Sequence, residues 1–346
     1  MILTGEDALK KHLKQNTPAR LYFIYGDEDY LKSNYSLLLA SKITDTSGSG
    51  FNFYQFNSEM TFDMFYEACE SLPMMADRIC VFVKDLPLNK LTDAELKDYE
   101  KLLSDLPETT TVIFSMVTVP VDKNTAKWKN IIDMFSKYGV CAELSKRNMQ
   151  SMIKMLVSRA EQAGCSISNQ NAQYLINAVG DDLNRLLGEF DKVCAYASKR
   201  EITADMIDKV AVRSVEASVF NIAKAINSSD GDKAYKLLSE LLKQKTEPTL
   251  IVGVLAGEYA DLYRMKMSDK YGGSLREIST EFSYKNKEFR LKNASRLCKN
   301  YSEKRIKKIM ETIADTDIKI KTSGADKTMI LEELIAKLLL LTGKTG

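Results

Sequence analysis

The chain has 346 residues, of which 45% are hydrophobic and 28% are charged, and its formal net charge at pH 7 is +2. This balance excludes an intrinsically disordered chain, and the length allows two or three domains with cores of their own. A single histidine, His12, leaves almost no material for histidine-dependent catalysis or for a histidine-rich metal site, so we expect no bound metal.

The chain carries no signal for membrane insertion or export. Its apolar runs fall short of the roughly 18 residues of a membrane span, and residues 1–7 lack the basic start and apolar core of a signal peptide. We therefore expect a cytoplasmic protein without a membrane partner. The six cysteines are far apart and form no C-x-x-C pair, which predicts buried free thiols.

Residues 1–145 alternate short apolar runs with helical stretches, which predicts a parallel sheet covered by helices. Three of the runs are apolar almost throughout, as expected of parallel strands buried on both faces. The five expected strands are 21–25, 51–56, 79–83, 111–116 and 140–144, and the expected helices are 29–43, 61–70, 92–105 and 125–137. The first domain is thus a five-stranded α/β domain.

Residues 26–33, with the sequence GDEDYLKS, follow the first expected strand and resemble a phosphate-binding loop that has lost its working parts. Gly26, Lys32 and Ser33 match the Walker A spacing, but Leu31 replaces the second glycine. The acidic run 27–29 puts carboxylates where phosphate oxygens would sit, and like charges about 4 Å apart repel by roughly 4 kcal/mol at an effective dielectric of 20. Ligands of open α/β sheets bind at such strand ends, so we interpret the loop as a nucleotide site that binds no nucleotide. A chance match is the alternative.

The position after the third strand, where an ATPase would carry acids for Mg²⁺ and water, holds Lys84 and Asp85. One acid beside a lysine is a poor Mg²⁺ site. Both ATPase motifs fail together, so we expect no cofactor, no catalytic residue and no ATPase activity. The loop then keeps a structural role, in which Gly26 turns the chain and Asp27 or Asp29 caps the next helix.

Residues 71–78, SLPMMADR, connect an amphipathic helix to the buried third strand. Pro73 stops the helix, which leaves Leu72, Met74 and Met75 in a short connector. Exposed apolar clusters on loops mark partner sites, and Met adapts well to another protein's pocket. The alternative, which the pattern alone favours, is that the connector folds back and buries these side chains on the sheet.

After residue 144 the strand signals stop and the rest of the chain reads as helix, divided into a small bundle at 146–212 and a larger helical domain at 213–346. The first contains an apolar stripe from Leu183 to Ala197. In the second, the apolar helix 329–341 is expected to pack inside a bundle or against another subunit. Between Lys285 and Lys308, ten Lys or Arg stand against two Glu. This excess of eight favours a solvated helical face slightly over phosphate contact.

Six segments, taken in order, resemble the family of delta subunits of bacterial DNA polymerase III clamp loaders. They span nearly the whole chain: LYFIYGDEDYL, SLPMMADRICVFV, VGDDLNRLLGEFDKV, ASVFNIAKAI, EPTLIVGVLA and ADTDIKIKTSG. The resemblance implies an AAA+-like five-stranded parallel-sheet domain at 1–145 and a helical lid domain at 146–212, without ATP binding. It also implies a helical collar domain at 213–346 that joins the subunit to the other clamp-loader subunits.

The resemblance further implies that the connector inserts apolar side chains into a pocket of the sliding clamp (beta) and opens the ring for loading onto primed DNA. Leu72, Met74 and Met75 stand at the inserting positions, with Pro73 among them. Family members often carry Leu-Phe where this chain has Met74 and Met75, which keeps the bulk but lacks the aromatic ring. The implied partners are the clamp, the other loader subunits and primer-template DNA.

Two functions from other classes stay open on the sequence. The first is an active AAA+ or P-loop ATPase with an aberrant loop that uses Lys32 and Ser33. The second is a structural adaptor in which Leu72 and Met75 are buried in the core. Nucleotide binding distinguishes the first from a clamp-opening subunit, and the stability of connector variants distinguishes the second.

Overall fold

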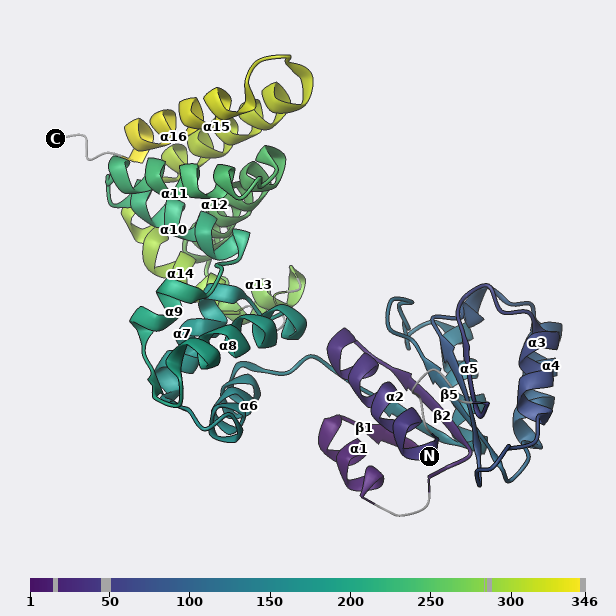
Figure 1. Cartoon of the computed structure of the whole chain (residues 1–346). Coiled ribbons are helices and arrows are strands. Elements are labelled where there is room, and N and C mark those ends of the chain that lie inside the picture. Colours follow the sequence, from purple (N-terminus) through teal and green to yellow (C-terminus); the bar gives the residue numbers. More distant parts are fainter. Residues whose placement is uncertain (15–17, 45–50, 283, 285–287, 343–346) are drawn as a thin grey trace. The chain divides into compact units, whose positions relative to one another are not determined.

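A computed structural model of the chain describes residues 1–14, 18–44, 51–282, 284 and 288–342. The chain forms two compact units, Met1–Arg147 and Asn148–Gly346. Within the described ranges, no helix is both long enough and apolar enough to cross a membrane. Figure 1 labels the elements of each unit.

The first unit is built on a six-stranded sheet in the order β1-β6-β2-β5-β4-β3, in which every neighbouring pair is parallel. The strands are β1 (Ile2–Thr4), β2 (Leu21–Tyr25), β3 (Phe53–Phe56), β4 (Ile79–Lys84), β5 (Thr110–Ser115) and β6 (Val140–Glu143). All five expected strands are present, but the expectation of only five was wrong. The sixth, β1, has three mostly exposed residues, too few to show a period of two.

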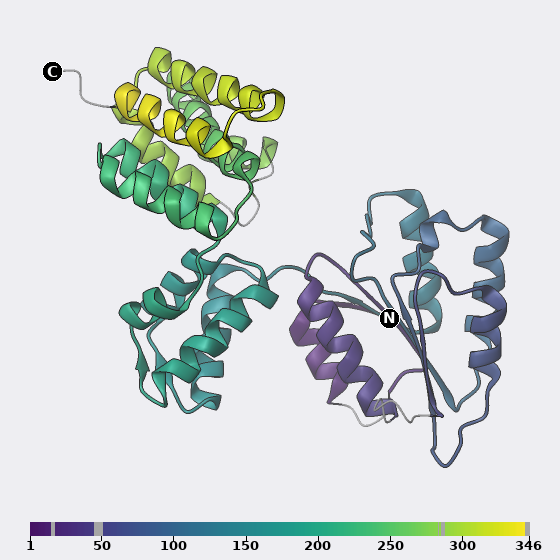
Figure 2. The ribbon, with the colours of Figure 1, turned by 45° about the horizontal axis from the view of Figure 1, so that its top comes forward.

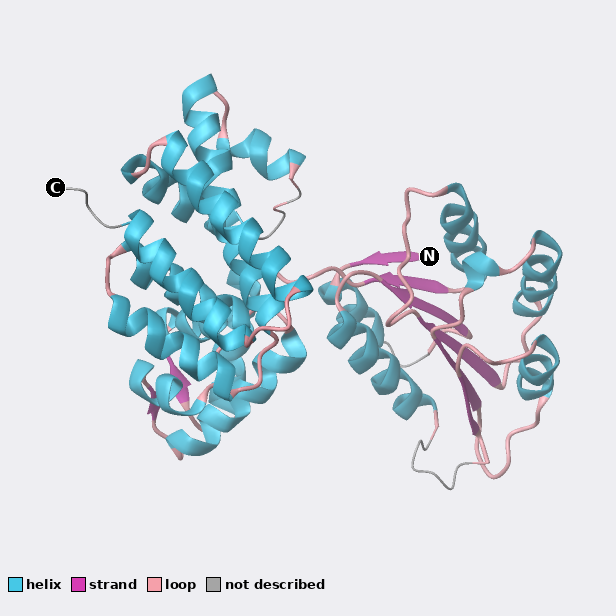
Figure 3. Cartoon of the chain, turned by 90° about the horizontal axis from the view of Figure 1, so that it is seen from above, coloured by secondary structure: helices cyan, strands magenta, loops and turns pink. Residues whose placement is uncertain are grey.

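Helices cover both faces of this sheet, as Figure 3 shows. α1 (Glu6–Leu13) and α2 (Asp29–Ile43) lie on one face, and α3 (Phe62–Glu70), α4 (Asp93–Ser104) and α5 (Ala126–Tyr138) lie on the other (Figure 2). The single-turn η1 (Leu88–Lys90) precedes α4. Because both faces are covered, β2 and β5 are buried along their whole length.

Aromatic rings form part of the core between the sheet and α3, α4 and α5. Phe135 of α5 stacks on Phe23 with ring centroids 4.5 Å apart, and Phe114 contacts Phe135 edge-on at 4.9 Å. Phe65 of α3 continues the cluster at 5.6 Å from Phe114. Such pairs stabilise a core by about 0.5 to 1.5 kcal/mol beyond their burial. The core therefore fixes α3, and with it the start of the connector, against the sheet.

The second unit is mostly helical. Its helices are α6 (Met149–Gln162), α7 (Asn169–Val179), α8 (Leu183–Ala197), α9 (Ala204–Val210), α10 (Val215–Asn227), α11 (Gly231–Lys243), α12 (Pro248–Tyr271), α13 (Leu275–Glu281), α14 (Glu288–Leu297), η2 (Cys298–Asn300), α15 (Glu303–Thr322) and α16 (Lys327–Thr342). The expectation that strands end at residue 144 was wrong at one place, where β7 (Ser166–Ile167) pairs with β8 (Glu201–Ile202). Strands of two residues are too short to show the alternation of apolar and polar residues by which a strand is recognised in a sequence.

The expected apolar stripe is confirmed in α8, which buries every residue of the stripe and is capped by Asp182, whose Oδ1 accepts from the Arg185 N–H at 2.8 Å. A second core extends from Val219 to Leu338. On α16 the apolar residues from Ile330 to Leu338 face this core, while the Leu340 side chain is 83% exposed. The division of this unit at residue 213 into a lid and a collar stays a prediction.

Candidate partner-binding connector and vacated nucleotide loop

The turn after β2 needs glycine because two backbone segments meet there. Gly26 has φ of 129°, and a Cβ added to it would lie 2.2 Å from the Leu144 carbonyl oxygen. That same oxygen accepts a hydrogen bond from the Glu28 N–H at 3.2 Å. Because residue 26 is a glycine, the chain that follows β2 can pack directly against the chain that follows β6. The predicted turn at Gly26 is confirmed.

The predicted cap of α2 by Asp27 or Asp29 was wrong. The N-cap residue is Glu28, and its side chain makes no capping hydrogen bond. Asp29 is the first helical residue and forms an ion pair with Lys32, at 3.0 Å between Oδ1 and Nζ. The negative charge of Asp29 still stabilises the helix, because it lies at the positive end of the helix dipole. Any of the three consecutive acids Asp27, Glu28 and Asp29 could have stood at the N-cap, and the sequence alone did not distinguish them.

Lys32, the lysine of the Walker-like pattern, is held inside the protein. Its side chain is 3% exposed, and Nζ donates to the Val117 carbonyl at 2.8 Å. Leu31 beside it is buried in the core. To contact a bound phosphate, the Lys32 ammonium would have to leave the Val117 carbonyl without its donor.

Asp85, at the position of the second ATPase motif, is also engaged in structure. Its Oδ1 accepts the backbone N–H groups of Thr118 and Val119 at 2.7 and 3.4 Å. Lys32 and Asp85 therefore both hold the loop that follows β5, Lys32 at Val117 and Asp85 at the next two residues. The two positions that an ATPase would use for phosphate and Mg²⁺ here fix one surface loop.

This arrangement separates the expected effects of two neighbouring substitutions. Lys32→Ala is expected to lower the free energy of unfolding of the first unit by about 2 to 3 kcal/mol, because it removes a hydrogen bond from a charged donor and leaves the Val117 carbonyl unpaired. Ser33→Ala, at a partly exposed position, is expected to change it by less than about 0.5 kcal/mol. Urea unfolding measures both values. Equal effects would contradict the structural role of Lys32.

The connector places its three large apolar side chains in solvent. Leu72 is 81% exposed, Met74 is 58% exposed and Met75 is fully exposed. The alternative in which the connector folds back onto the sheet was therefore wrong. Pro73 is half-buried and stands in the extended segment that follows α3, as its helix-stopping role predicts.

Hydrogen bonds hold the start of the connector to the end of α3 and to the sheet. The Ser71 hydroxyl donates to the Glu67 carbonyl at 2.8 Å, and the Thr110 hydroxyl donates to the Cys69 carbonyl at 2.9 Å. Thr110 is the first residue of β5 and is fully buried. The end of α3 is thus tied to a central strand.

The middle of the connector is held by Asn52, next to the start of β3. The Asn52 amide donates to the Met74 carbonyl at 2.8 Å and accepts from the Met74 N–H at 2.7 Å. The Ile79 N–H then bonds the Thr109 carbonyl at 2.8 Å where β4 begins. The exposed side chains therefore stand on a backbone that is fixed at both ends and in the middle.

Met75 adds a strained backbone to this arrangement. Its φ is +53°, in the left-handed region that a residue with a side chain enters at a cost of about 1 to 3 kcal/mol. Burial raises the pKa of Cys69 and raises that of Cys80 to about 12, which disfavours the reactive thiolate form of the two cysteines that flank the connector. The chemistry that this surface offers is apolar contact.

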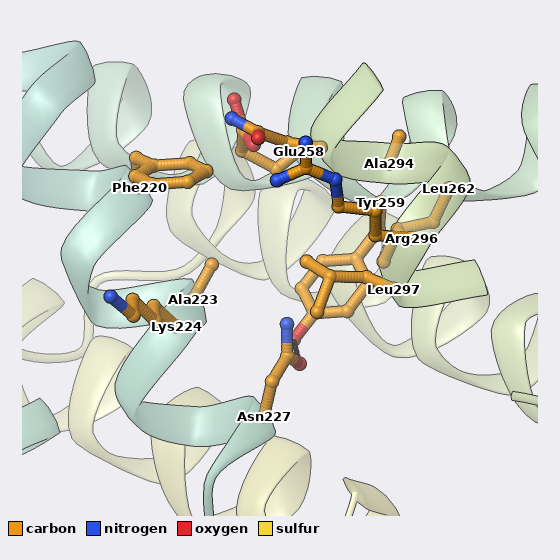
Figure 4. Close-up of a pocket in the computed structure, with 11 residues that line it drawn as sticks. Phe220, Ala223, Lys224, Asn227, Glu258, Tyr259, Leu262, Ala294, Arg296 and Leu297 are labelled. Atoms are coloured by element: carbon orange, nitrogen blue, oxygen red, sulfur yellow. Dashed lines mark hydrogen bonds between the residues drawn. The ribbon is translucent and has the colours of Figure 1, made fainter. Parts of the chain in front are cut away.

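The second unit contains a cavity of about 320 Å³ between α10, α12 and α14. Its walls are mainly apolar and include the charged residues Lys224, Glu258 and Arg296, and Figure 4 shows Asn227 beside Tyr259. Asn227 Oδ1 accepts the Tyr259 hydroxyl at 3.2 Å. Among the described residues that line the cavity there is no Ser, Cys or His, so it offers no nucleophile of the usual kind.

The basic cluster is partly neutralised. Arg290 pairs with Glu258 at 3.1 Å and with Asp261 at 2.9 Å, and Lys307 pairs with Glu303 at 2.8 Å. Lys285 and Lys287 lie outside the described residues. Phosphate contact by the remaining basic residues stays a prediction. In the described part of the chain, no group of three or more His, Cys, Asp or Glu side chains could hold a metal ion.

Comparison with known proteins gives one consistent family. The model described as "DNA polymerase III, delta subunit" matches residues 22–139, and "DNA polymerase III delta subunit, C-terminal domain" matches residues 216–338. The Bacillus subtilis (strain 168) "DNA polymerase III subunit delta" is 24% identical over 334 residues, 95% of each chain. The Aquifex aeolicus (strain VF5) "Probable DNA polymerase III subunit delta" is 23% identical over 323 residues, 91% of this chain and 90% of that protein.

A solved structure shows the same fold. The Bacillus subtilis DNA clamp loader delta protein superposes with a TM-score of 0.64 and 24% identity, covering 96% of this chain and 98% of that one. The expected fold class, a parallel-sheet α/β domain followed by a mostly helical part, is confirmed, with six strands in place of five.

Proposed function

The chain belongs to the family of DNA polymerase III delta subunits, and from this we propose that it binds the sliding clamp through the connector and opens the ring. The observation that carries the proposal is the exposure of Leu72, Met74 and Met75 on a backbone that hydrogen bonds hold in place. An exposed apolar cluster is costly to keep in water and marks a surface that a partner covers.

The size of the cluster suits a clamp pocket. Fully burying a Leu or Met side chain contributes about 1.5 to 3 kcal/mol. Three such side chains supply a large part of the roughly 8 kcal/mol that a micromolar complex requires. The hydrogen bonds of Asn52 reduce the cost of ordering the connector on binding, because its backbone is already fixed.

Opening the ring requires more than affinity. A subunit that bound closed and open rings with equal affinity would not shift the equilibrium between them. Moving that equilibrium from 1% to 99% open requires about a 10⁴-fold higher affinity for the open ring. We infer that the connector holds a clamp conformation that the closed interface resists. Opening is then driven by binding, and no chemical step occurs on this chain.

ATP is bound and hydrolysed by other subunits in this proposal. The engagement of Lys32 with Val117, and of Asp85 with the next loop residues, supports a chain without ATPase activity of its own. The other clamp-loader subunits attach through the C-terminal helices, and primer-template DNA passes within the assembly. The active ATPase is the runner-up. It requires Lys32 to leave the Val117 carbonyl.

The test is to mix the purified chain with the sliding clamp of the same organism, without nucleotide. We expect a complex in analytical ultracentrifugation and release of clamps from nicked circular DNA. The folded chain failing to bind the clamp would rule out the proposal. A parallel titration with fluorescent ATP distinguishes the runner-up, because micromolar binding that is lost in Lys32→Ala would favour an ATPase.

A further inference from the structure

We propose that the clamp-binding surface extends from the connector to Phe51, whose ring forms an aromatic anchor beside Met74. The identity of the partner rests on the proposed function, whereas the surface itself follows from the placement of Phe51. Phe51 precedes β3. The sequence pattern placed it in the expected strand 51–56 and gave no sign of a binding role. Its partner would be an apolar patch at the rim of the pocket that receives the connector.

Phe51 is exposed in a way that a phenylalanine seldom is. Its side chain is 73% exposed, compared with 48% for Phe282. By contrast, Phe23 and Phe65, which pack in the core of this unit, are fully buried. The exposed ring offers much of the 150 to 250 Å² that an aromatic residue can bury on contact.

The sheet topology brings Phe51 to the same edge as the connector. β3 and β4 are parallel neighbours, and Phe53 pairs with Cys80. Adjacent parallel strands begin at one edge of a sheet, so the chain entering β3 and the chain entering β4 lie side by side there. The Cys80 N–H also bonds the Asn52 carbonyl at 2.8 Å, which extends the pairing one residue toward Phe51.

Asn52 links the two segments directly. Its amide makes both hydrogen bonds to the Met74 backbone, and Phe51 is the adjacent residue, with consecutive Cα atoms about 3.8 Å apart. A partner that contacts Met74 therefore meets Phe51 on the same rigid piece of backbone. We assign Asn52 as a positioning residue that holds the ring and the connector in one arrangement.

The two parts of the surface have complementary chemistry. Leu72, Met74 and Met75 are flexible and adapt to a pocket, whereas a phenylalanine ring is rigid and loses little rotamer freedom when it is covered. Aromatic residues are enriched among the few positions that dominate interface affinity. A rigid ring next to adaptable side chains therefore fits a partner with a pocket and an apolar rim.

The test compares clamp affinities of the full chain. Phe51→Ala is expected to lower the affinity at least tenfold with an unchanged unfolding midpoint, and Phe51→Tyr is expected to bind nearly as well as the wild type. Tyr271→Ala is the matched control, because Tyr271 is a 76% exposed aromatic residue of the second unit. It is expected to bind the clamp as the wild type does.

A photo-crosslinking residue at position 51 provides a second readout that does not depend on removing the ring. We expect a covalent adduct with the clamp from position 51 and none from position 271. If Phe51→Ala binds the clamp with wild-type affinity and position 51 gives no adduct, the inference about Phe51 is wrong. The proposed function still holds in that case, provided that the connector variants lose clamp binding. Absence of clamp binding by the wild-type chain overturns both.

Discussion

Replacing both Leu72 and Met75 by alanine is expected to lower the affinity for the sliding clamp about a hundredfold and to leave the protein folded. Each truncation at the centre of an interface costs about 1 to 2 kcal/mol, and each 1.4 kcal/mol is a factor of ten in affinity. The two side chains are 81% and fully exposed, so few contacts inside the protein are lost. Surface substitutions of this kind change stability by less than about 0.5 kcal/mol.

Clamp binding by surface plasmon resonance and urea unfolding of the same preparation provide the two measurements. Leu37→Ala on α2 is the control, because Leu37 is 55% exposed and lies outside the connector. It is expected to change neither value. If the double variant unfolded, the connector would be part of the core and the adaptor would be the better interpretation. If it folded and bound like the wild type, the connector would not be the clamp site.

Gly26→Ala is expected to lower the free energy of unfolding of the first unit by about 3 to 5 kcal/mol, at the upper end for a single substitution. Two causes act together. The backbone at φ 129° is strained for any residue with a side chain, which costs about 1 to 3 kcal/mol. The added Cβ would also lie 2.2 Å from the Leu144 carbonyl oxygen, so either β2 or the chain after β6 has to move.

Gly5→Ala separates these two causes. Gly5 has φ of 87°, but a Cβ added there would meet no atom within 4 Å. It is expected to show the backbone cost alone, about 1 to 2 kcal/mol. Trp128, the single tryptophan, is buried in α5 of the same unit, so its fluorescence during urea unfolding reports this unit. Equal effects of the two substitutions would contradict the close approach at Leu144.

The sequence by itself was sufficient wherever a pattern is local and repeats. β2 and β5 were predicted from continuous apolar runs, and α8 from a stripe at helical spacing. The turn at Gly26 was predicted as well, because glycine allows the positive φ that the backbone adopts there. The order of several segments then indicated the family.

The tertiary structure decided everything that depends on two distant segments meeting. Lys32 bonds Val117, which lies 85 positions along the chain, and Asp85 bonds Thr118, which lies 33 positions along. No local sequence pattern encodes either bond. The same holds for β1, which is a strand only because β6 lies beside it.

The connector shows the difference most clearly. Its composition was compatible both with a buried loop and with a partner site, since apolar side chains suit either. Asn52, 22 residues away, fixes the Met74 backbone by two hydrogen bonds, and in the folded chain Leu72, Met74 and Met75 face solvent. Burial is a property of the packed chain, so a sequence can supply the apolar side chains of this surface, but only the fold determines that they face solvent.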